Sequence, residues 1–405
     1  KFTKQNHIMD RLILKNGKII FPDKIEEDMT VVCENGIITD ILDSKEFIPG
    51  NGNIVIDATN KYIAPGFIDI HTHGGGGHDF MDGTVEAYLG AAETHAKYGT
   101  TALLPTTLTS TIDELINTFN VYKEAVKKNT KGAKFLGLHL EGPYFAYNQR
   151  GAQDPKYLRN PEPEEYNKIL SGSDDIVRWS LAPELPGAFE FGKVLTSKNI
   201  LTSIAHSDAI YEEVVDAFNA GFTHVTHLYS AMSSVTRRNA FRYAGVLEAA
   251  YLIDDMTVEI IADGVHLPKP LLQFVYKFKG PEKTALCTDS MRGAGMPDGE
   301  SILGSLEKGQ KVIIEDGVAK LPDRTAFAGS VATTDRLVRT MTEVAEVPLV
   351  EAVKMMTLTP ARIMRIDKHK GSILKGKDAD IVVFDNNINV SHTILEGNVI
   401  YTNQH

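Results

Sequence analysis

The chain has 405 residues, of which 42% are hydrophobic and 23% charged, a composition that is typical of soluble globular proteins and excludes disordered and fibrous classes. Its formal net charge of −11 disfavours a nucleic-acid partner, because binding to a phosphate backbone depends on clustered Lys and Arg. The N-terminal residues lack the apolar stretch of a secretory signal, and no segment offers the ~18 uninterrupted apolar residues of a membrane span. Cys33 and Cys287 are too few for a disulfide framework. We therefore expect a cytoplasmic protein with no nucleic-acid or membrane partner.

The N-terminal part of the chain, residues 10–63, contains short strand-like runs separated by Gly and Pro turns. From residue 66 onward the pattern changes to short β-branched and apolar runs that alternate with helical segments, as in repeated βα units. The N-terminal runs cover residues 12–14, 18–21, 30–34 and 54–56, and the eight later ones cover 66–71, 101–106, 135–141, 177–184, 201–206, 223–227, 257–263 and 284–289. Helix candidates between the later runs include residues 84–98, 112–128, 211–220 and 270–278.

Eight βα units predict an α/β fold of the (β/α)8 TIM-barrel type. An open doubly wound sheet is the alternative, but the Gly-rich dinucleotide fingerprint does not follow the first strand, and the four glycines at 74–77 indicate a flexible loop instead. After two helix-like segments at 333–345 and 349–366, strand-like runs return at 371–374, 380–385 and 392–395. We therefore predict a barrel over residues 64–366 and one small β-sandwich domain formed by residues 1–63 and 367–405.

Potential metal ligands and proton-transfer groups stand where the predicted barrel strands end, and this end of a barrel carries the active site. One such residue alone is usually structural, but a convergent set predicts a site. The set comprises His71, His73, Glu141, Glu184, His206, His227, Asp263 and Asp289.

His71 and His73 are two residues apart on a strand, so both side chains can face one ion. Glu141 adds a carboxylate that can bridge two cations, and His206 and His227 add nitrogen ligands from adjacent strands. This mixture of imidazole and carboxylate favours Zn or Fe(II) over Ca, with one or two ions per chain. By contrast, His224 has the opposite strand parity to His227 and is expected to pack in the core, and His95 lies in a helix pattern typical of a surface residue.

Asp289 ends the eighth predicted strand, next to the proposed ligands. A carboxylate there can accept a proton from an attacking water and return it to a leaving group, as a general base and then a general acid. A helix N-cap or a salt-bridged carboxylate is the structural alternative. Together with a Lewis-acidic metal, Asp289 predicts a hydrolytic centre for amides or esters.

Several segments resemble the N-acetylglucosamine-6-phosphate deacetylases of the amidohydrolase superfamily, from about residue 10 to 400. PGFIDIHTH at 65–73 is similar to the first-strand signature of amidohydrolases, and GSILKGKDADI at 371–381 resembles their C-terminal β segment. More specific are HLEGP at 139–143, AHSDA at 205–209, THLY at 226–229, DGVH at 263–266 and TDS at 288–290.

This resemblance implies that Glu141, His206 and His227 hold the catalytic metal, that Asp289 is the acid/base, and that His266 reaches the substrate. Members with the His-x-His pair can hold a second metal, which here would involve His71 and His73. The resemblance also implies a sugar phosphate as the small-molecule substrate, and a homodimer whose partner subunit helps to complete its site.

Three positions depart from the family pattern. Gln153, after Gly151 and Ala152, replaces a common His thought to polarise the acetyl carbonyl; Ser230 replaces an Asn; and Arg242 stands in a segment that keeps only its Arg and last Gly. We expect the 6-phosphate to bind Arg242 and His266, with Arg237 and Arg238 as rivals to Arg242. Further substrate contacts are expected from Ala152, Gln153, Ser230, Ala231, Phe327, Ala328 and Gly329, the last three in a loop.

The predicted reaction is hydrolysis of the acetamide of N-acetyl-D-glucosamine 6-phosphate to D-glucosamine 6-phosphate and acetate. Other amidohydrolases, acting on a different N-acyl sugar phosphate, a cyclic amide or a dipeptide, would share the barrel and the metal ligands. A phosphoesterase would also use clustered ligands. A non-catalytic sugar-phosphate-binding regulator is disfavoured, because Asp289 would be expected to be lost.

Overall fold

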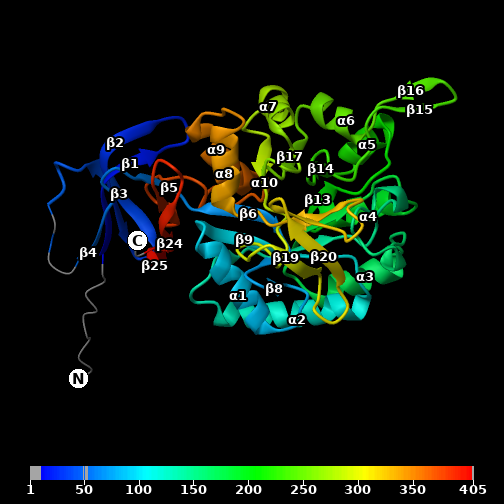
Figure 1. The fold of residues 1–405 in the computed structure, drawn as a ribbon, viewed down its shortest axis with the longest axis horizontal. Coiled ribbons are helices and arrows are strands. Elements are labelled where there is room, and N and C mark those ends of the chain that lie inside the picture. Colours follow the sequence, from blue (N-terminus) through cyan, green and yellow to red (C-terminus); the bar gives the residue numbers. More distant parts are fainter. Residues whose placement is uncertain (1–10, 49, 51–52, 404–405) are drawn as a thin grey trace.

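The computed structural model describes residues 11–48, 50 and 53–403, and its main body is a barrel of parallel strands (Figure 1). Neighbouring strands pair in the order β6, β9, β11, β12, β13, β14, β17 and β18. A parallel bridge between Thr72 and Ser290 joins the last strand segment to the first, so the barrel closes and the doubly wound alternative is wrong. The strands are β6 (Phe67–Thr72), β9 (Thr100–Thr107), β11 (Leu138–Glu141), β12 (Ile176–Leu181), β13 (Leu201–Ile204), β14 (Phe222–Val225), β17 (Thr257–Ile260) and β18 (Thr284–Leu286), and the short β10 (Lys134–Phe135) also pairs with β9.

Helices between the strands cover the barrel and bury its outer face. The helix α2 (Ile112–Lys128) shows why: it begins at a capping box in which Thr111 and Glu114 bond each other's backbone, and it buries Leu115, Phe119 and Tyr122 on one face. The predicted helix at 349–366 is divided at Thr357 into two shorter ones. The others are α1 (Val85–Ala96), α3 (Pro163–Gly172), α4 (Ala188–Ser197), α5 (Tyr211–Asn219), α6 (Val246–Leu252), α7 (Lys269–Phe278), α8 (Thr334–Glu343), α9 (Leu349–Met356) and α10 (Leu358–Ile363).

Strands from both ends of the chain form a separate eight-stranded sheet, as the sequence predicted (Figure 1). The central contact is antiparallel pairing between β5 (Tyr62–Pro65) and β23 (Ile381–Phe384). This sheet has its own buried cluster, which includes Leu14, Ile63 and Ile381. Its remaining strands are β1 (Arg11–Ile20), β2 (Ile25–Glu34), β3 (Ile37–Asp43), β4 (Asn53–Asp57), β24 (Val390–Leu395) and β25 (Asn398–Thr402).

Some predicted details of this sheet were wrong. The runs at 12–14 and 18–21 belong to one long strand, β1, and residues 371–374 form no strand. The strands β3, β5 and β25 were not predicted. The domain boundaries at 63/64 and 366/367 stay a prediction, and residues 1–10, 49, 51–52 and 404–405 lie outside the described part of the chain.

Insertions after the barrel strands add small antiparallel sheets that the sequence analysis did not predict. One insertion forms a four-stranded sheet between β18 and α8, and the backbones of Asp289 and Ser330 hydrogen-bond where its last strand meets the barrel mouth. A second forms a hairpin that projects from the molecule between β14 and α6 (Figure 1). The elements are β15 (Thr236–Arg238), β16 (Phe241–Tyr243), β19 (Gly299–Leu303), β20 (Gln310–Glu315), β21 (Val318–Lys320) and β22 (Phe327–Ser330), with β7 (Gly74–Gly75) and β8 (His78–Asp79) after β6. Within the described residues, no helix is long and apolar enough to cross a membrane.

Candidate metal centre

Three of the candidate residues follow barrel strands in an unusual backbone conformation. His206, His227 and Asp289 have φ angles of +47°, +31° and +45°, in the left-handed region that residues other than Gly rarely adopt. Such residues persist only where the surrounding structure holds them, at a cost of about 1–3 kcal/mol each, and they cluster at functional sites. This turn at the end of each strand directs the three side chains into the barrel mouth.

Glu141, His206 and His227 converge on one point. Glu141 Oε1 lies 3.4 Å from His206 Nε2 and 3.1 Å from His227 Nε2, and the two Nε2 atoms are 3.2 Å apart. All three residues are buried. The other ring nitrogen of His206, Nδ1, donates a hydrogen bond to the carbonyl of Gln149 at 2.7 Å. The free lone pair of the ring is therefore on Nε2. Ring nitrogens that face each other and a carboxylate fit a divalent cation.

His71 and His73 form a second group against the same carboxylate. Their Nε2 atoms are 3.3 Å apart, and they lie 3.5 and 3.4 Å from Oε1 and Oε2 of Glu141, respectively. Glu141 thus faces both pairs of histidines, as a bridging carboxylate would. The arrangement fits one cation or two.

Asp289 stands at the edge of this cluster. Its Oδ1 lies 3.4 Å from His71 Nε2 and 3.2 Å from His73 Nε2. Burial alone would raise the pKa of Asp289, but His71 and His73 outweigh it and hold the pKa below its usual value. The carboxylate is therefore kept ionised, which is the state that a general base needs.

Glu141 is also held ionised, since burial would raise its pKa but the surrounding histidines lower it well below the usual value. Conversely, burial would lower the pKa of His73, whereas hydrogen bonds to Asp289 and Glu141 raise it well above the usual value. Both shifts have the same origin: buried carboxylates favour positive charge beside them. A bound cation would supply that charge.

The cluster opens into a cavity of about 390 Å³. Several residues expected to contact substrate line it, and Ala328 does not: its side chain is buried in a small apolar cluster beneath β22. Residues 327–329, predicted as a loop, belong to that strand. The backbone N–H of Ser230 donates to the carbonyl of His227, so it is not free to donate to a substrate. The expected lining residues are Ala152, Gln153, Ser230, Ala231, His266, Phe327 and Gly329.

His266 lines the cavity and is oriented by Asp263, whose Oδ2 lies 2.7 Å from His266 Nδ1. Backbone N–H groups of Val265 and His266 also donate to Asp263. Burial would raise the pKa of Asp263, but His266 lowers it below the usual value. Asp263 thus supports His266 and makes no hydrogen bond to the clustered candidate ligands.

Residues 62–400 match the model of the amidohydrolase family. The chain belongs to the amidohydrolase family. An N-acetylglucosamine-6-phosphate deacetylase of Lysinibacillus sphaericus is 32% identical over 96% of this chain and 97% of its own length. An N-acetylgalactosamine-6-phosphate deacetylase of Escherichia coli O157:H7 is 31% identical over 95% of this chain and 98% of its own length. The crystal structure of N-acetylglucosamine-6-phosphate deacetylase from Pasteurella multocida is 29% identical, with a TM-score of 0.89 over 97% of this chain and all of that one.

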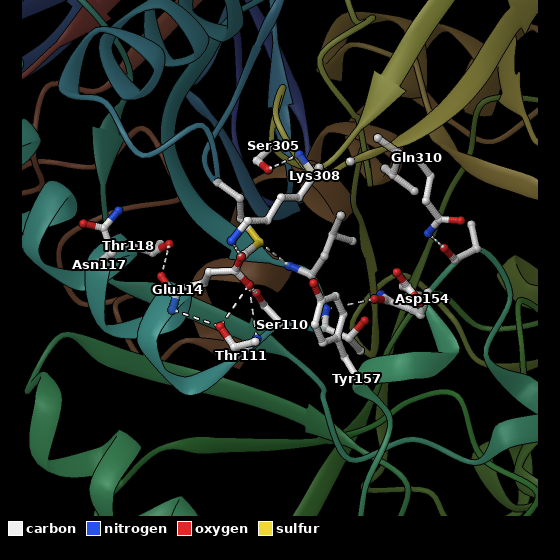
Figure 2. A pocket seen from close by; sticks show the side chains of 18 of the residues that line it. Ser110, Thr111, Glu114, Asn117, Thr118, Asp154, Tyr157, Ser305, Lys308 and Gln310 are labelled. Atoms are coloured by element: carbon white, nitrogen blue, oxygen red, sulfur yellow. Dashed lines mark hydrogen bonds and ion pairs between the residues drawn. The ribbon is translucent and has the colours of Figure 1, made fainter.

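Among the departures from the deacetylase pattern, Gln153 lies deepest in this amidohydrolase site. It lines both the cavity at the candidate metal ligands and a neighbouring cavity of about 430 Å³. Figure 2 shows this second cavity, where Lys308 points toward Glu114, which also contacts Ser110 and Thr111. The second cavity contains none of the clustered ligands.

Arg242 lies apart from the site of this chain. It is exposed on β16 of the projecting hairpin, opposite Arg237 on β15, and it does not line the cavity. Arg238 lies over the ring of Tyr243 at 5.5 Å. The three arginines thus form a basic, exposed end of the hairpin, and none of them reaches the amidohydrolase centre within one chain.

Two buried charged residues of the barrel interior were missed. Arg178 on β12 and Glu259 on β17 form an ion pair with no exposed surface, and Glu259 Oε1 lies 2.7 Å from His71 Nδ1. Burial would raise the pKa of Glu259, but Arg178 and His71 hold it well below the usual value. Both residues stand within strands, whereas the candidate residues predicted from the sequence stand at strand ends. The signal available was a charged residue inside an apolar barrel strand.

Two other expectations about the site need correction. His95 is fully buried, with Nε2 3.0 Å from the Gly74 carbonyl, and is not a surface residue. Glu184 accepts hydrogen bonds from Ser207 and from the backbone of Asp208, so it anchors the loop after β13 and does not join the candidate metal ligands. His224 is buried, as expected, and contacts Thr257 and Glu259.

Proposed function

We propose that this amidohydrolase removes the acetyl group of N-acetyl-D-glucosamine 6-phosphate, releasing D-glucosamine 6-phosphate and acetate. The observation that carries the proposal is the convergence of Glu141, His206 and His227 with Asp289 in one cavity. Relatives that align with nearly the whole chain are named as deacetylases of 6-phosphorylated N-acetyl amino sugars. Such a substrate needs a hydrolytic centre and a site for its phosphate. His266, which lines the cavity, can donate a hydrogen bond to that phosphate.

In the proposed reaction, Asp289 accepts a proton from water as the water oxygen attacks the acetyl carbon. The carbon–nitrogen bond then breaks, and Asp289 returns the proton to the departing amine, so the proton balance closes within one turnover. His266, fixed by Asp263, donates a hydrogen bond to the substrate. A divalent cation held by Glu141, His206 and His227 would polarise the acetyl carbonyl and make the attacking water more acidic.

We propose Zn as the bound metal, with Fe(II) as the alternative, at one or two ions per chain. The support is the ligand set: four imidazoles and one carboxylate suit either ion better than Ca or Mg. Elemental analysis of the purified protein tests this, with at least one equivalent expected and the larger share carried by Zn. Full activity in chelator with fewer than ~0.5 equivalents would exclude a metal centre of this kind.

The substrate assignment is tested by measuring acetate release from N-acetylglucosamine 6-phosphate, N-acetylgalactosamine 6-phosphate and unphosphorylated N-acetylglucosamine. The expected order is highest kcat/KM for the glucosamine phosphate and lowest for the unphosphorylated sugar. Equal rates with and without the phosphate would leave an amidohydrolase of different substrate. Release of inorganic phosphate instead of acetate would identify a phosphoesterase.

We propose a homodimer in which the partner subunit contributes to the sugar-phosphate site. An apolar hollow on the surface includes Leu252, Phe274 and Phe278, which are 66%, 43% and 56% exposed. Tyr229 lines both this hollow and the metal-site cavity, so a subunit covering the hollow would lie beside the active site. We also propose a cytoplasmic location, which suits the unpaired, buried Cys33 and Cys287.

A further inference from the structure

The interior of this barrel holds a charged pair where barrels of this type usually carry branched apolar side chains. Arg178 and Glu259 are fully buried, and the guanidinium donates to both carboxylate oxygens, at 2.6 Å from Nη1 to Oε2 and 2.9 Å from Nη2 to Oε1. Replacing such a pair with apolar residues of similar volume is often neutral or stabilising. Its presence therefore indicates a role other than stability.

The guanidinium has all five of its N–H groups engaged, which fixes its position. Besides Glu259, it donates to the carbonyl of Ile70 at 2.9 Å, to Thr226 Oγ1 at 2.9 Å and to Ser203 Oγ at 3.2 Å. These partners lie on or directly after four different strand segments of the barrel. Arg178 thus holds the carboxylate of Glu259 in one place relative to the strands around it.

Glu259 in turn contacts His71, one of the two His-x-His residues. Its Oε1 lies 2.7 Å from His71 Nδ1, and an ionised carboxylate can only accept, so Nδ1 carries the proton. The lone pair of His71 is then on Nε2, which lies within 3.3–3.5 Å of His73 Nε2, Asp289 Oδ1 and Glu141 Oε1. The nitrogen that faces the cluster is therefore the one able to bind a metal.

The ligands of the Glu141, His206 and His227 group do not share this support through their side chains. His206 is oriented by the Gln149 carbonyl, and the only contact of Glu259 with the group is a 3.4 Å bond from the backbone N–H of His227. His73 is oriented by the carbonyl of Thr106, 3.2 Å from its Nδ1. Only one of the two metal positions thus depends on Glu259 through a ligand side chain.

We propose that Glu259, held by Arg178, is a positioning residue that orients His71 and thereby sets the occupancy of a second metal position formed with His73, Glu141 and Asp289. This inference rests on the metal centre of the proposed function. The two metal positions thus differ in what orients their ligands. The buried Arg178–Glu259 pair orients a ligand of one position from within the barrel, and loops at the barrel mouth orient a ligand of the other.

The test compares Zn²⁺ content and affinity in the full-length wild type and Glu259→Gln, after growth with Zn²⁺ and dialysis against metal-free buffer. The wild type is expected to hold two equivalents and Glu259→Gln one, with the second equivalent bound about 10–100-fold more weakly on back-titration. His71→Gln is expected to reproduce this result, and combining both changes should add nothing further. Raising free Zn²⁺ should restore the second equivalent in Glu259→Gln.

Asp380→Asn is the matched control, because it neutralises another buried carboxylate, paired with Lys370 at 2.5 Å far from the metal cluster. It should keep both equivalents. If Glu259→Gln fails to fold because Arg178 loses its partner, the double variant Arg178→Met/Glu259→Gln removes the charge imbalance and is measured instead.

Two equivalents at unchanged affinity in Glu259→Gln, or loss of both, would overturn the inference. So would a wild type that binds only one Zn²⁺ at saturating metal, which leaves the proposed function intact. Failure of both Glu259 variants to fold, while Asp380→Asn folds, would make the pair a stability element and also overturn it. A wild type without bound metal would instead contradict the proposed function itself.

Discussion

Gln153 donates a hydrogen bond from Nε2 to Oε2 of Glu141 over 2.8 Å, and its Oε1 accepts one from the backbone N–H of Thr109 over 3.0 Å. The amide is thereby fixed at both ends, beside the carboxylate oxygen that does not face His206 and His227. At the position where the deacetylase pattern has a histidine, this chain therefore has a residue that supports a proposed metal ligand, Glu141.

Gln153→Leu is expected to weaken metal binding by about 10–100-fold, because the buried Oε2 of Glu141 loses its donor. Equilibrium dialysis against a chelator series measures this. Gln310→Leu is the matched control, since Gln310 donates to the neighbouring Ala152 carbonyl at 2.7 Å and anchors the same loop without touching Glu141. An equal loss in both variants would mean that the loop, and not the Gln153–Glu141 bond, is responsible.

Asp289→Asn is expected to retain the metal ion proposed at Glu141, His206 and His227, while kcat for acetate release falls by ~10²-fold or more, the usual size of a general acid–base contribution. The side chain keeps its shape but can no longer accept the proton. Steady-state kinetics with parallel elemental analysis checks both parts. A near-wild-type kcat would refute the assignment of Asp289 as the acid/base.

Arg242→Ala is expected to raise KM for the 6-phosphorylated sugar by the equivalent of ~2 kcal/mol, as when a charged group loses its hydrogen-bonding partner. Activity on the unphosphorylated sugar should change little. Arg237→Ala, on the opposite strand of the same hairpin, tests the rival and should leave KM unchanged; a larger rise in KM than for Arg242→Ala would assign the phosphate contact to Arg237. Because Arg242 does not line the cavity of its own chain, the effect requires that it act across the proposed dimer. If both sugars are affected equally, Arg242 does not recognise the phosphate.

Phe278→Asp is expected to convert a dimer of twice 44.5 kDa into monomers, since it places a charge in the exposed apolar hollow. Light scattering after size-exclusion chromatography measures the mass. Phe189→Asp on α4, where the ring is 38% exposed and lies beside Lys193, should leave the mass unchanged. A wild-type protein that is monomeric at micromolar concentration would contradict the dimer.

The carboxylate of Glu114 predicts a pH-dependent contribution to stability. Burial would raise its pKa, but hydrogen bonds from Lys308, Ser110 and Thr111 lower it to about 2. The ionised carboxylate therefore stabilises the folded state at pH values above 4.5, the ordinary pKa of Glu, and this stabilisation is lost as the pH falls from 4.5 toward 2. Glu114→Gln should lower the free energy of unfolding by about 1 kcal/mol at pH 7, after allowance for solvent screening.

The difference in free energy of unfolding between wild type and Glu114→Gln should be constant from pH 8 to 5 and should shrink below 4.5. Urea unfolding at each pH measures it. Glu124→Gln on the same helix, where the exposed carboxylate pairs with Lys127 at 2.8 Å, should have a smaller effect at every pH. A difference that grows on acidification would reverse the sign and exclude the proposed cause.

The barrel and the gathering of the candidate ligands were predictable because both leave a local trace: each strand is a short apolar run, and each candidate ligand stands at or near the end of one. The Arg178–Glu259 pair was not predictable, because the two residues lie on strands about 80 residues apart in sequence and only the closed barrel brings them together. The burial of His95 was missed for a similar reason: its acceptor, the Gly74 carbonyl, lies on the short strand β7 that follows β6. Residues 299–330 carry turns and short runs whose pairing with one another is visible only in the fold.

The pairing of β5 with β23 has a consequence for the order of assembly during synthesis, because roughly 300 residues separate the two strands. At ~5–20 residues per second, β23 is made roughly 15–60 s after β5. Throughout that interval the β5 edge and apolar side chains such as Ile63 lack their partner strand, while the barrel strands emerge and can pair. The free edge of β5 is therefore open to wrong pairing until β23 is made, and this sheet is completed only after the barrel strands have been synthesised.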